Sequence, residues 1–279
     1  MLTLLKITRR FHIPLTTLQR TVRFAINPTS ASADNAWSNG KGGVPAVVGL
    51  GRWFEFSVEC AGEPDLATGY LVDIRTIDRA VRNDVAPIIA RACAETPDAE
   101  PGEIMPEIVA TVSSAIPSVR AVVWHVTPYY WVRMTTGNTY KVRIAQRFEF
   151  AAAHRLHSPA LTDEQNRAAY GRCNNPAGHG HNYQVEPVVE VALDPDSAQP
   201  FTLTDLERCT GKTIIDRFDH KHLNTDVPEF AGLIPSVEMI AKIAFDLLAP
   251  EIERESRGAA RLVRITIWET EKTSATYSA

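Results

Sequence analysis

Six of the eight histidines of this chain fall within residues 154–222. Two of them, His179 and His181, are separated by one glycine directly before a segment with the pattern of a strand. Because side chains alternate between the two faces of a strand, both imidazoles are expected to project from the same face. His154, at the end of the preceding strand, can reach the pair by antiparallel pairing. An isolated His-x-His pair is more often just two exposed strand residues, but three histidines with an open fourth position are typical of a catalytic zinc site.

The hydrophobic pattern of residues 139–279 predicts the elements that position these histidines. We expect strands at 141–150, 182–193 and 261–268, and helices near 203–216 and 236–249. A long polar loop that ends at Gly178 separates the first two strands. The histidines therefore lie where a strand ends, where the next one begins, and in the loop beside them.

The first half of the chain repeats this order of elements. We expect strands from about Thr21, at 53–60, at 119–126 and at 129–134, and helices at 74–94 and 106–116, the first of them kinked by Pro87. Gly49–Phe54 aligns with Gly178–Tyr183, and Val122–His125 aligns with Thr266–Glu269. We infer a tandem duplication, with one unit in residues 1–138 and the second in residues 139–279.

The composition excludes several classes of protein. The 279 residues carry a formal net charge of −4 and 44% of them are hydrophobic, which indicates a globular protein with no nucleic-acid partner. No apolar run is long enough for a transmembrane helix, so no membrane partner is expected either. The four cysteines have no paired spacing, which argues against a disulfide scaffold. We expect a cytoplasmic protein, although the acid-free, arginine-containing stretch before Asp34 is also compatible with a targeting segment.

Five segments of the second half resemble, in order, the motifs of the 6-pyruvoyl-tetrahydropterin synthase and 6-carboxytetrahydropterin synthase family. They are Phe148–Leu156, Tyr170–Tyr183, Asp219–Asn224, Pro235–Glu238 and Trp268–Thr270. The resemblance is dense over residues 140–279 and faint before them, so it implies a tandem chain with a degenerate N-terminal copy. The implied fold class is α+β, with tandem tunnelling-fold (T-fold) domains, each an antiparallel four-stranded sheet with two helices, that assemble into a β-barrel.

The same resemblance implies roles for the residues that would carry the reaction. The metal would be Zn²⁺, and its ligands would be His154, His179 and His181. Cys173 resembles the catalytic cysteine of the family and would act as a base. A free thiol is mostly protonated at neutral pH, so Asp219 and His220 would activate it: the carboxylate orients the imidazole, and the imidazole polarises the thiol.

Other charged residues would contact the substrate. Glu269 ends an apolar strand, where its carboxylate could accept two N–H groups from the edge of a pterin in a charge-assisted contact. Glu238 lies in the first turn of a helix, where a capping role and a substrate contact are both open. Arg155 and Lys221 are candidates for the triphosphate tail, although lone basic residues are usually only solvated.

The implied activity is that of a carbon-oxygen lyase of tetrahydrobiopterin biosynthesis. Such an enzyme converts 7,8-dihydroneopterin triphosphate to 6-pyruvoyl-tetrahydropterin and releases triphosphate. One alternative is the 6-carboxytetrahydropterin synthase of queuosine biosynthesis, which acts on the same substrate but usually has a shorter gap between the cysteine and the His-Gly-His. The other alternative is a non-catalytic scaffold that binds zinc or a pterin.

The N-terminal copy is expected to be silent. In the alignment Leu50 takes the place of His179, Arg52 that of His181 and His125 that of Glu269. Without these groups the copy should bind no zinc and catalyse nothing. Single-domain relatives assemble as two stacked trimers, so we expect a homotrimer of the two-domain chain, with one ring of catalytic domains stacked on one ring of silent domains.

Overall fold

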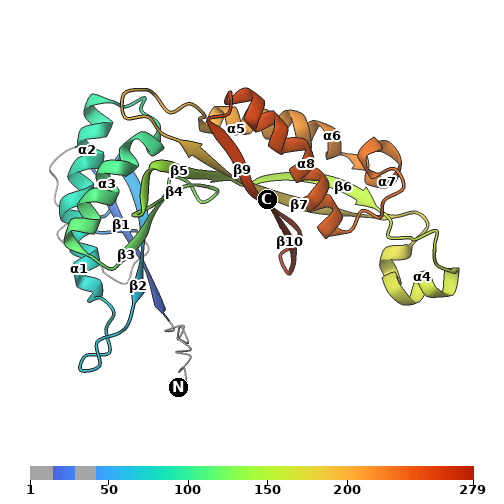
Figure 1. Ribbon diagram of the computed structural model, residues 1–279, viewed down its shortest axis with the longest axis horizontal. Helices are drawn as coiled ribbons and strands as arrows, with labels where there is room; N and C mark the ends of the chain where they lie inside the picture. The colour runs from blue at the N-terminus through green and yellow to red at the C-terminus, as the bar shows by residue number, and fades with distance from the viewer. Residues whose placement is uncertain (1–14, 29–41) are drawn as a thin grey trace, which may run out of the picture.

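The computed structural model of this chain describes residues 15–28 and 42–279. They form one continuous ten-stranded sheet, and the long helices lie on one of its sides (Figure 1). The start of the chain, for which a targeting segment was one interpretation, includes residues 1–14, which lie outside the described residues. Among the helices that the structure describes, none is both long and apolar enough to cross a membrane.

The N-terminal half is an antiparallel sheet whose four strands lie side by side in chain order. The strands are β1 (Thr16–Ile26), β2 (Arg52–Gly62), β3 (Val119–His125) and β4 (Tyr130–Thr135). Between β2 and β3 the chain forms α1 (Ile74–Arg79), α2 (Ala86–Glu95) and α3 (Pro101–Ala115). The expected order of two strands, helices and two strands is therefore present.

The C-terminal half has the same order. Its strands are β5 (Asn138–Gln146), β6 (Phe148–His154), β7 (His179–Ala192), β9 (Ala260–Thr270) and β10 (Thr273–Ser278). β5 and β6 pair with β7 in one register and together take the place of a single long strand. The main helices are α5 (Leu203–Thr210), α6 (Asp216–Phe218) and α8 (Val237–Glu255). Three short elements flank the histidine end of this unit: α4 (Asp163–Tyr170), β8 (Lys221–His222) and α7 (Leu223–Asp226).

Both units interrupt their first long helix in the same way. A wider π-helical turn at Ala80–Val85 joins α1 to α2, directly before Pro87. Proline lacks the N–H group and its ring collides with the carbonyl of the preceding turn, so the backbone widens there instead of breaking. A π-helical turn at Gly211–Ile215 joins α5 to α6 in the second unit. The kink or division expected at Pro87 takes the form of a local widening within one continuous helical segment. The second unit widens at the same place without a proline.

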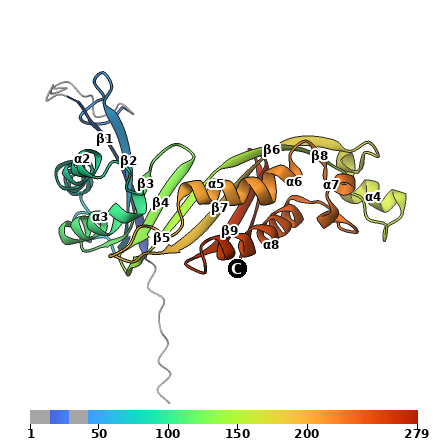
Figure 2. The same ribbon diagram turned by 90° about the horizontal axis from the view of Figure 1, so that it is seen from above.

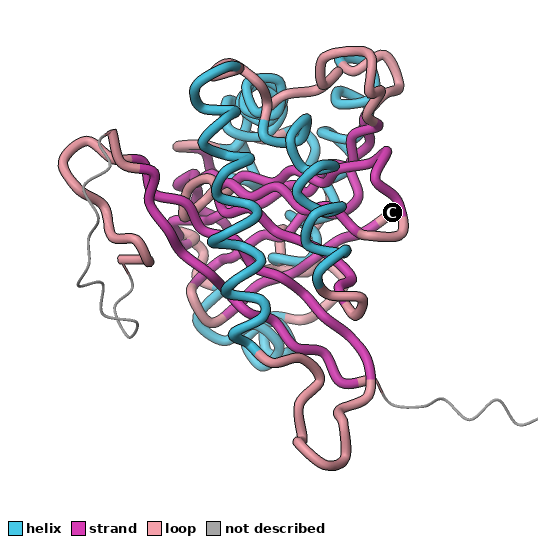
Figure 3. Tube along the Cα trace, turned by 90° about the vertical axis from the view of Figure 1, so that its left-hand side faces the viewer, coloured by secondary structure: helices cyan, strands magenta, loops and turns pink. Residues whose placement is uncertain are grey.

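Alternation along the strands creates one apolar face, and the helices cover it (Figures 2 and 3). In the N-terminal unit Phe24 and Phe54 stack with ring centroids 5.5 Å apart beneath the helices. In the C-terminal unit Phe150 and Tyr183 stack at 5.0 Å at the corresponding place. Each fully buried aromatic side chain stabilises the fold by about 3 kcal/mol. The other face carries no helix, and ion pairs such as Arg133–Glu59 and Arg23–Glu55 lie on it.

A buried carboxylate organises part of this helix-free face. Glu190 of β7, whose side chain is only 10% exposed, forms ion pairs with Lys141, Arg143 and Arg261 from the two neighbouring strands. Burial raises the pKa of this carboxyl group, but hydrogen bonds from the three cations outweigh it and hold the pKa at about 2. Glu190 is therefore ionised at neutral pH.

The two units are joined edge to edge within one sheet. β4 pairs with β5 in antiparallel fashion, with Val132 opposite Ile144, and a tight turn connects the two strands. This arrangement contradicts the expected stacking of a ring of catalytic domains on a ring of silent ones. Backbone hydrogen bonds place the two units side by side in the same sheet, so a ring built from this chain contains both kinds of unit.

Candidate metal centre and active site

Antiparallel pairing of β6 with β7 brings the three predicted histidines together. His154 ends β6 directly opposite His179, the first residue of β7, and His181 follows two residues later on the same face. Each ring offers a nitrogen within 4.8 Å of the nitrogens of the other two. The Nε2 atoms of His154 and His179 are 3.1 Å apart. This is the only group of three or more potential metal ligands among the described residues.

Hydrogen bonding and burial favour ring nitrogens that can bind a cation. His154 is fully buried, and its Nδ1–H donates to the carbonyl oxygen of Pro235 at 2.7 Å, which leaves the lone pair on Nε2 facing His179. Burial lowers the pKa of His154 to about 4, and it also lowers the pKa of His179. Nε2 of His181 is buried without a hydrogen-bond partner in the described part of the chain. Converging ring nitrogens, of which Nε2 of His181 has no partner in the described part of the chain, fit a metal ion.

The turn before β7 leaves no room for a side chain. Gly178 has φ +72°, a conformation that favours glycine. A Cβ atom there would lie 2.6 Å from Nε2 of His222 and 3.0 Å from the carbonyl oxygen of His154. Gly178 therefore allows the chain to pass close behind the cluster and to present His179 opposite His154.

Glu269 lies beside the cluster at the end of β9. Its Oε1 atom is 3.4 Å from Nε2 of His154 and 3.7 Å from Nε2 of His181. The carboxylate is 20% exposed, so it faces both the histidines and the solvent-accessible space next to them. A ligand held by Glu269 would consequently lie against the three histidines.

Asp219 and His220 form a pair after the end of α6. The Oδ2 atom of Asp219 accepts a hydrogen bond from Nδ1 of His220 at 2.7 Å, and its Oδ1 atom accepts one from the backbone N–H of Ala151 at 2.8 Å. These two bonds lower the pKa of Asp219. His220 has φ +57° and its side chain is 83% exposed. The carboxylate thus orients an imidazole that is open to solvent.

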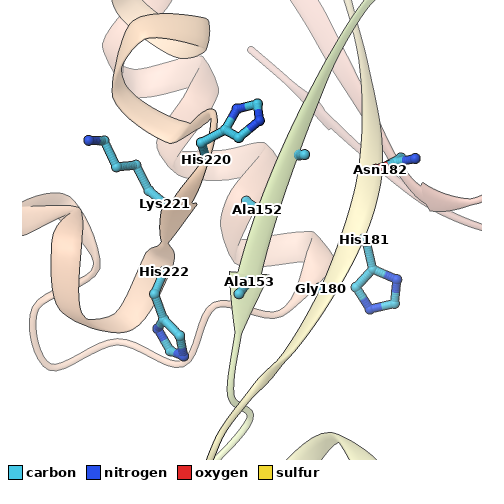
Figure 4. Close-up of a pocket in the computed structure, with 9 residues that line it drawn as sticks. Ala152, Ala153, Gly180, His181, Asn182, His220, Lys221 and His222 are labelled. Atoms are coloured by element: carbon cyan, nitrogen blue, oxygen red, sulfur yellow. The ribbon is translucent and has the colours of Figure 1, made fainter.

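This imidazole lines a pocket of about 550 Å³ that spans three neighbouring strands (Figure 4). β8 contributes Lys221 and His222, β6 contributes Ala152 and Ala153, and β7 contributes His181. In Figure 4, β6 runs between His220 and His181. The pocket therefore touches the histidine cluster on one side and the Asp219–His220 pair on the other.

Cys173 lies on a turn that is tied to the segment after His154. It lies on a short 3₁₀ turn, Gly171–Asn174, that follows α4, and its side chain is half-buried. The backbone N–H of Leu156 donates to the carbonyl oxygen of Cys173 at 2.9 Å, which ties this turn to the segment after His154. Among the hydrogen bonds of the described residues, none joins the Cys173 thiol to His220.

The remaining predicted contacts have local partners. Ser236 caps α8 by accepting from the backbone N–H of Met239, and its hydroxyl group also bonds to Glu238 and lowers the pKa of that carboxyl group. Arg155 donates to the carbonyl and side-chain oxygens of Asn174. Glu238 therefore belongs to a helix start, and Arg155 holds the turn that carries Cys173. Sequence reasoning placed Pro235 in a family-like segment but missed its role, because a backbone carbonyl that fixes the ring of His154 leaves no trace in residue types.

The strand register corrects the alignment of one residue, His125, between the two units. Phe24 faces Phe54 as Phe150 faces Tyr183, so β2 matches β7 as aligned. In this alignment Glu55 corresponds to Gln184. His125 lies opposite Glu55 and Trp268 lies opposite Gln184, so His125 corresponds to Trp268. The next residue, Val126, therefore takes the place of Glu269. The alignment of His125 with Glu269 was therefore wrong by one residue. His125 belongs to the helix-free face, where its Nε2 is 3.1 Å from Oγ of Ser57.

The second half of the chain is similar to known proteins. Residues 143–279 match the family model described as 6-pyruvoyl tetrahydropterin synthase. A 6-pyruvoyl tetrahydrobiopterin synthase of Poecilia reticulata is 42% identical over 128 residues, which are 46% of this chain and 84% of that protein. The Homo sapiens protein of the same name is 34% identical over 141 residues, 50% of this chain and 94% of that protein. A solved structure of Caenorhabditis elegans 6-pyruvoyl tetrahydropterin synthase is 34% identical, covers 50% of this chain and 96% of its own, and superposes with a TM-score of 0.46.

Proposed function

The chain belongs to the 6-pyruvoyl tetrahydropterin synthase family, and we propose that its C-terminal unit converts 7,8-dihydroneopterin triphosphate to 6-pyruvoyl-tetrahydropterin with loss of triphosphate. One observation carries the proposal: three histidines converge within 4.8 Å and Glu269 lies directly beside them. This arrangement combines a metal site with a carboxylate suited to the N–H edge of a pterin.

The proposed metal is Zn²⁺, held by His154, His179 and His181. When bound, zinc would supply Lewis acidity toward the hydroxyl groups of the substrate side chain. The chain supplies the rest of the site. The Pro235 carbonyl keeps the ring of His154 in one tautomer. Glu269 would accept N–H groups of the pterin ring, so that the side chain of the substrate extends toward the histidines.

Cys173 is the proposed base. Its thiolate would take the proton from C1′ onto Sγ, the electron pair of that C–H bond would form C1′=C6, and N5 would take up a proton with the electron pair of the former C6=N5 bond. Transfer of a proton from the C1′ hydroxyl group to C6 would then give a ketone at C1′. Loss of a proton from C2′ would form C2′=C3′ as triphosphate leaves C3′ with its C–O electron pair, and the resulting enol would become the C2′ ketone when C3′ gains a proton. Asp219 and His220 would assist by accepting the proton of the thiol. In this proposal Nδ1–H of His220 stays on the carboxylate of Asp219, which leaves Nε2 free to act.

The Asp219–His220 pair would reach Cys173 either by a rearrangement within one chain or from a second copy. Mixing the inactive variants Cys173→Ala and His220→Ala distinguishes the two arrangements, because sites that combine residues from two copies regain activity in the mixture. A mixture that stays as inactive as its components assigns the pair to the same chain as its cysteine.

Residues 1–138 form the silent unit of this proposal, and residues 139–279 form the catalytic one. Arg52 replaces a histidine ligand in the first unit, and Val126 stands where the second unit has Glu269. An arginine cannot bind zinc and a valine cannot accept an N–H group, so this copy lacks both functions.

Mass spectrometry of the pterin product tests the proposal. The purified full-length chain is loaded with zinc and incubated with 7,8-dihydroneopterin triphosphate, and Cys173→Ala is the matched control. We expect a pyruvoyl side chain and free triphosphate from the wild type and unchanged substrate from the control. A product with a carboxyl group at C6 would instead assign the chain to 6-carboxytetrahydropterin synthesis, and unchanged substrate in both samples would refute catalysis.

A further inference from the structure

The first unit has a cavity at the place where the second unit has its histidine cluster. The cavity has a volume of about 320 Å³ and lies where β2 begins and β3 ends, and residues of α2 and of the loop before α3 form its opposite wall. Four residues on or next to these strands line it: Arg52, Phe54, Trp124 and Val126. By strand register Arg52 takes the place of His181, and Val126 takes that of Glu269. The first unit therefore keeps a cavity at this place without the metal ligands.

Apolar and aromatic side chains form most of the lining. Phe54 and Trp124 are buried, and their ring centroids lie 6.1 Å apart with an angle of 48° between the ring planes. Ile89 of α2, which is also buried, lines the same cavity, and the half-buried Val126 and Ile104 pack against the same core. Such a lining binds the apolar body of a ligand because it removes that body from water. Small-molecule sites have volumes of about 300–1,000 Å³, so this cavity suits a body of one or two rings.

Arg52 is the only charged residue among the described residues that line the cavity. It precedes Phe54 by two positions on β2, so both side chains belong to the helix-covered face of the strand. Arg52 is exposed, and it takes part in none of the ion pairs formed within residues 15–28 and 42–279. A guanidinium group is always charged and donates hydrogen bonds in a fork that matches a carboxylate. The position that offers a metal ligand in the second unit therefore offers a partner for an anion in the first.

We propose that this cavity binds a small aromatic carboxylate. The ring system lies against Phe54 and Trp124, and the carboxylate accepts two N–H groups of Arg52 at the exposed end of the cavity. Val126 stands where the second unit has the carboxylate of Glu269, so N–H groups on the ring of a pterin would lose their acceptor there. The ligand of the first unit thus differs from the substrate proposed for the second, and its binding is independent of the reaction proposed there.

Isothermal titration calorimetry of the full-length chain with 2-naphthoate tests the proposal. Metal is removed from the chain beforehand, so that the carboxylate cannot bind zinc in the second unit. The matched ligand is 2-naphthamide, which has nearly the same shape and no charge. We expect 2-naphthoate to bind at one site per chain and 2-naphthamide to bind roughly 10- to 100-fold more weakly, the loss typical of giving up a hydrogen bond between charged groups. No detectable binding of 2-naphthoate at millimolar concentration would refute the site.

Two arginine variants place the ligand. Arg52→Ala should weaken the binding of 2-naphthoate roughly 10- to 100-fold and leave the binding of 2-naphthamide unchanged. Because Arg52 is exposed, this variant should keep the thermal unfolding of the wild type. Arg120→Ala is the matched control, since Arg120 is also exposed but lies at the other end of β3, outside the cavity, and it should bind 2-naphthoate as the wild type does. Unchanged binding of 2-naphthoate to Arg52→Ala would refute this site, and equal affinity of the wild type for both ligands would refute recognition of the carboxylate.

Discussion

Replacing Gly178 by alanine perturbs the metal centre through the backbone without touching a ligand. The φ angle of +72° is unfavourable for alanine, and the added Cβ would lie 3.0 Å from the carbonyl oxygen of His154 and 2.6 Å from Nε2 of His222. The imidazole of His222 can rotate away from the new methyl group. The carbonyl of His154 cannot move without shifting the end of β6, and with it the ring of His154.

Two contributions set the expected loss of stability. Left-handed backbone costs a non-glycine residue roughly 1–2 kcal/mol, and crowding against packed atoms adds roughly 1–3 kcal/mol. We therefore expect Gly178→Ala to lower the free energy of unfolding by about 3 kcal/mol. Because the shift separates His154 from His179, zinc affinity should also fall roughly 10- to 100-fold, the range seen when the support of a metal ligand is removed.

Gly232→Ala is the matched control. Gly232 has φ +76°, and no atom lies within 4 Å of the position of its Cβ. This variant should lose only the backbone contribution, about 1–2 kcal/mol, and keep wild-type zinc affinity. Urea unfolding gives the free energies, and competition with a chromogenic chelator gives the zinc affinities. If the two variants match in both measurements, the close passage at Gly178 does not position the histidines.

Three further predictions concern the site and the sheet. Cys173→Ala should abolish turnover and still bind zinc, whereas His179→Ala should lose both zinc and turnover, because two histidines hold zinc weakly. Elemental analysis and an activity assay on both variants check this. Loss of zinc in Cys173→Ala would show that the cysteine is a metal ligand. Asp219→Asn should lower kcat by roughly 10²–10⁴-fold, since the orienting carboxylate of His220 is lost, and an unchanged kcat would remove the pair from the mechanism. Glu190→Gln should lower the free energy of unfolding by about 3 kcal/mol at pH 7. This figure follows from the difference between the pKa of Glu190 in the folded chain, about 2, and its ordinary value of 4.5. That stabilisation is present above about pH 4.5 and is lost as the pH falls toward 2, so wild type and variant should converge in acid, and a constant difference would contradict the role of the charge.

Local pattern predicted the long elements but missed four shorter ones, α4, β8, α7 and β10. The strands around His154 and His179 and the helix at α8 follow from clear apolar periodicity. The strongly polar sequence of α4 predicts a loop, although Thr162 and Gln165 form a capping box that marks the start of the helix. β10 (Thr273–Ser278) consists mainly of small polar residues, and its apolar partners on α8 are distant in sequence.

The histidine cluster was predictable, and its surroundings were less so. A one-residue spacer in a strand fixes the face of His179 and His181, so their convergence follows from geometry alone. Two errors came from pairing between strands, which residue types do not encode. The match of His125 to Glu269 was one residue out of register, which moves a side chain to the other face of the sheet. The pairing of β4 with β5, which excludes stacked rings of separate units, was likewise invisible in local sequence.

The number of zinc ions per chain tests the central claim most directly. Among the described residues, the second unit contains one three-histidine centre and the first contains none. Elemental analysis of the full-length chain, saturated with zinc and freed of excess metal, should give one zinc per chain. A value of two would show that the N-terminal unit also binds metal, and a value near zero would refute the metal centre on which the proposed reaction depends.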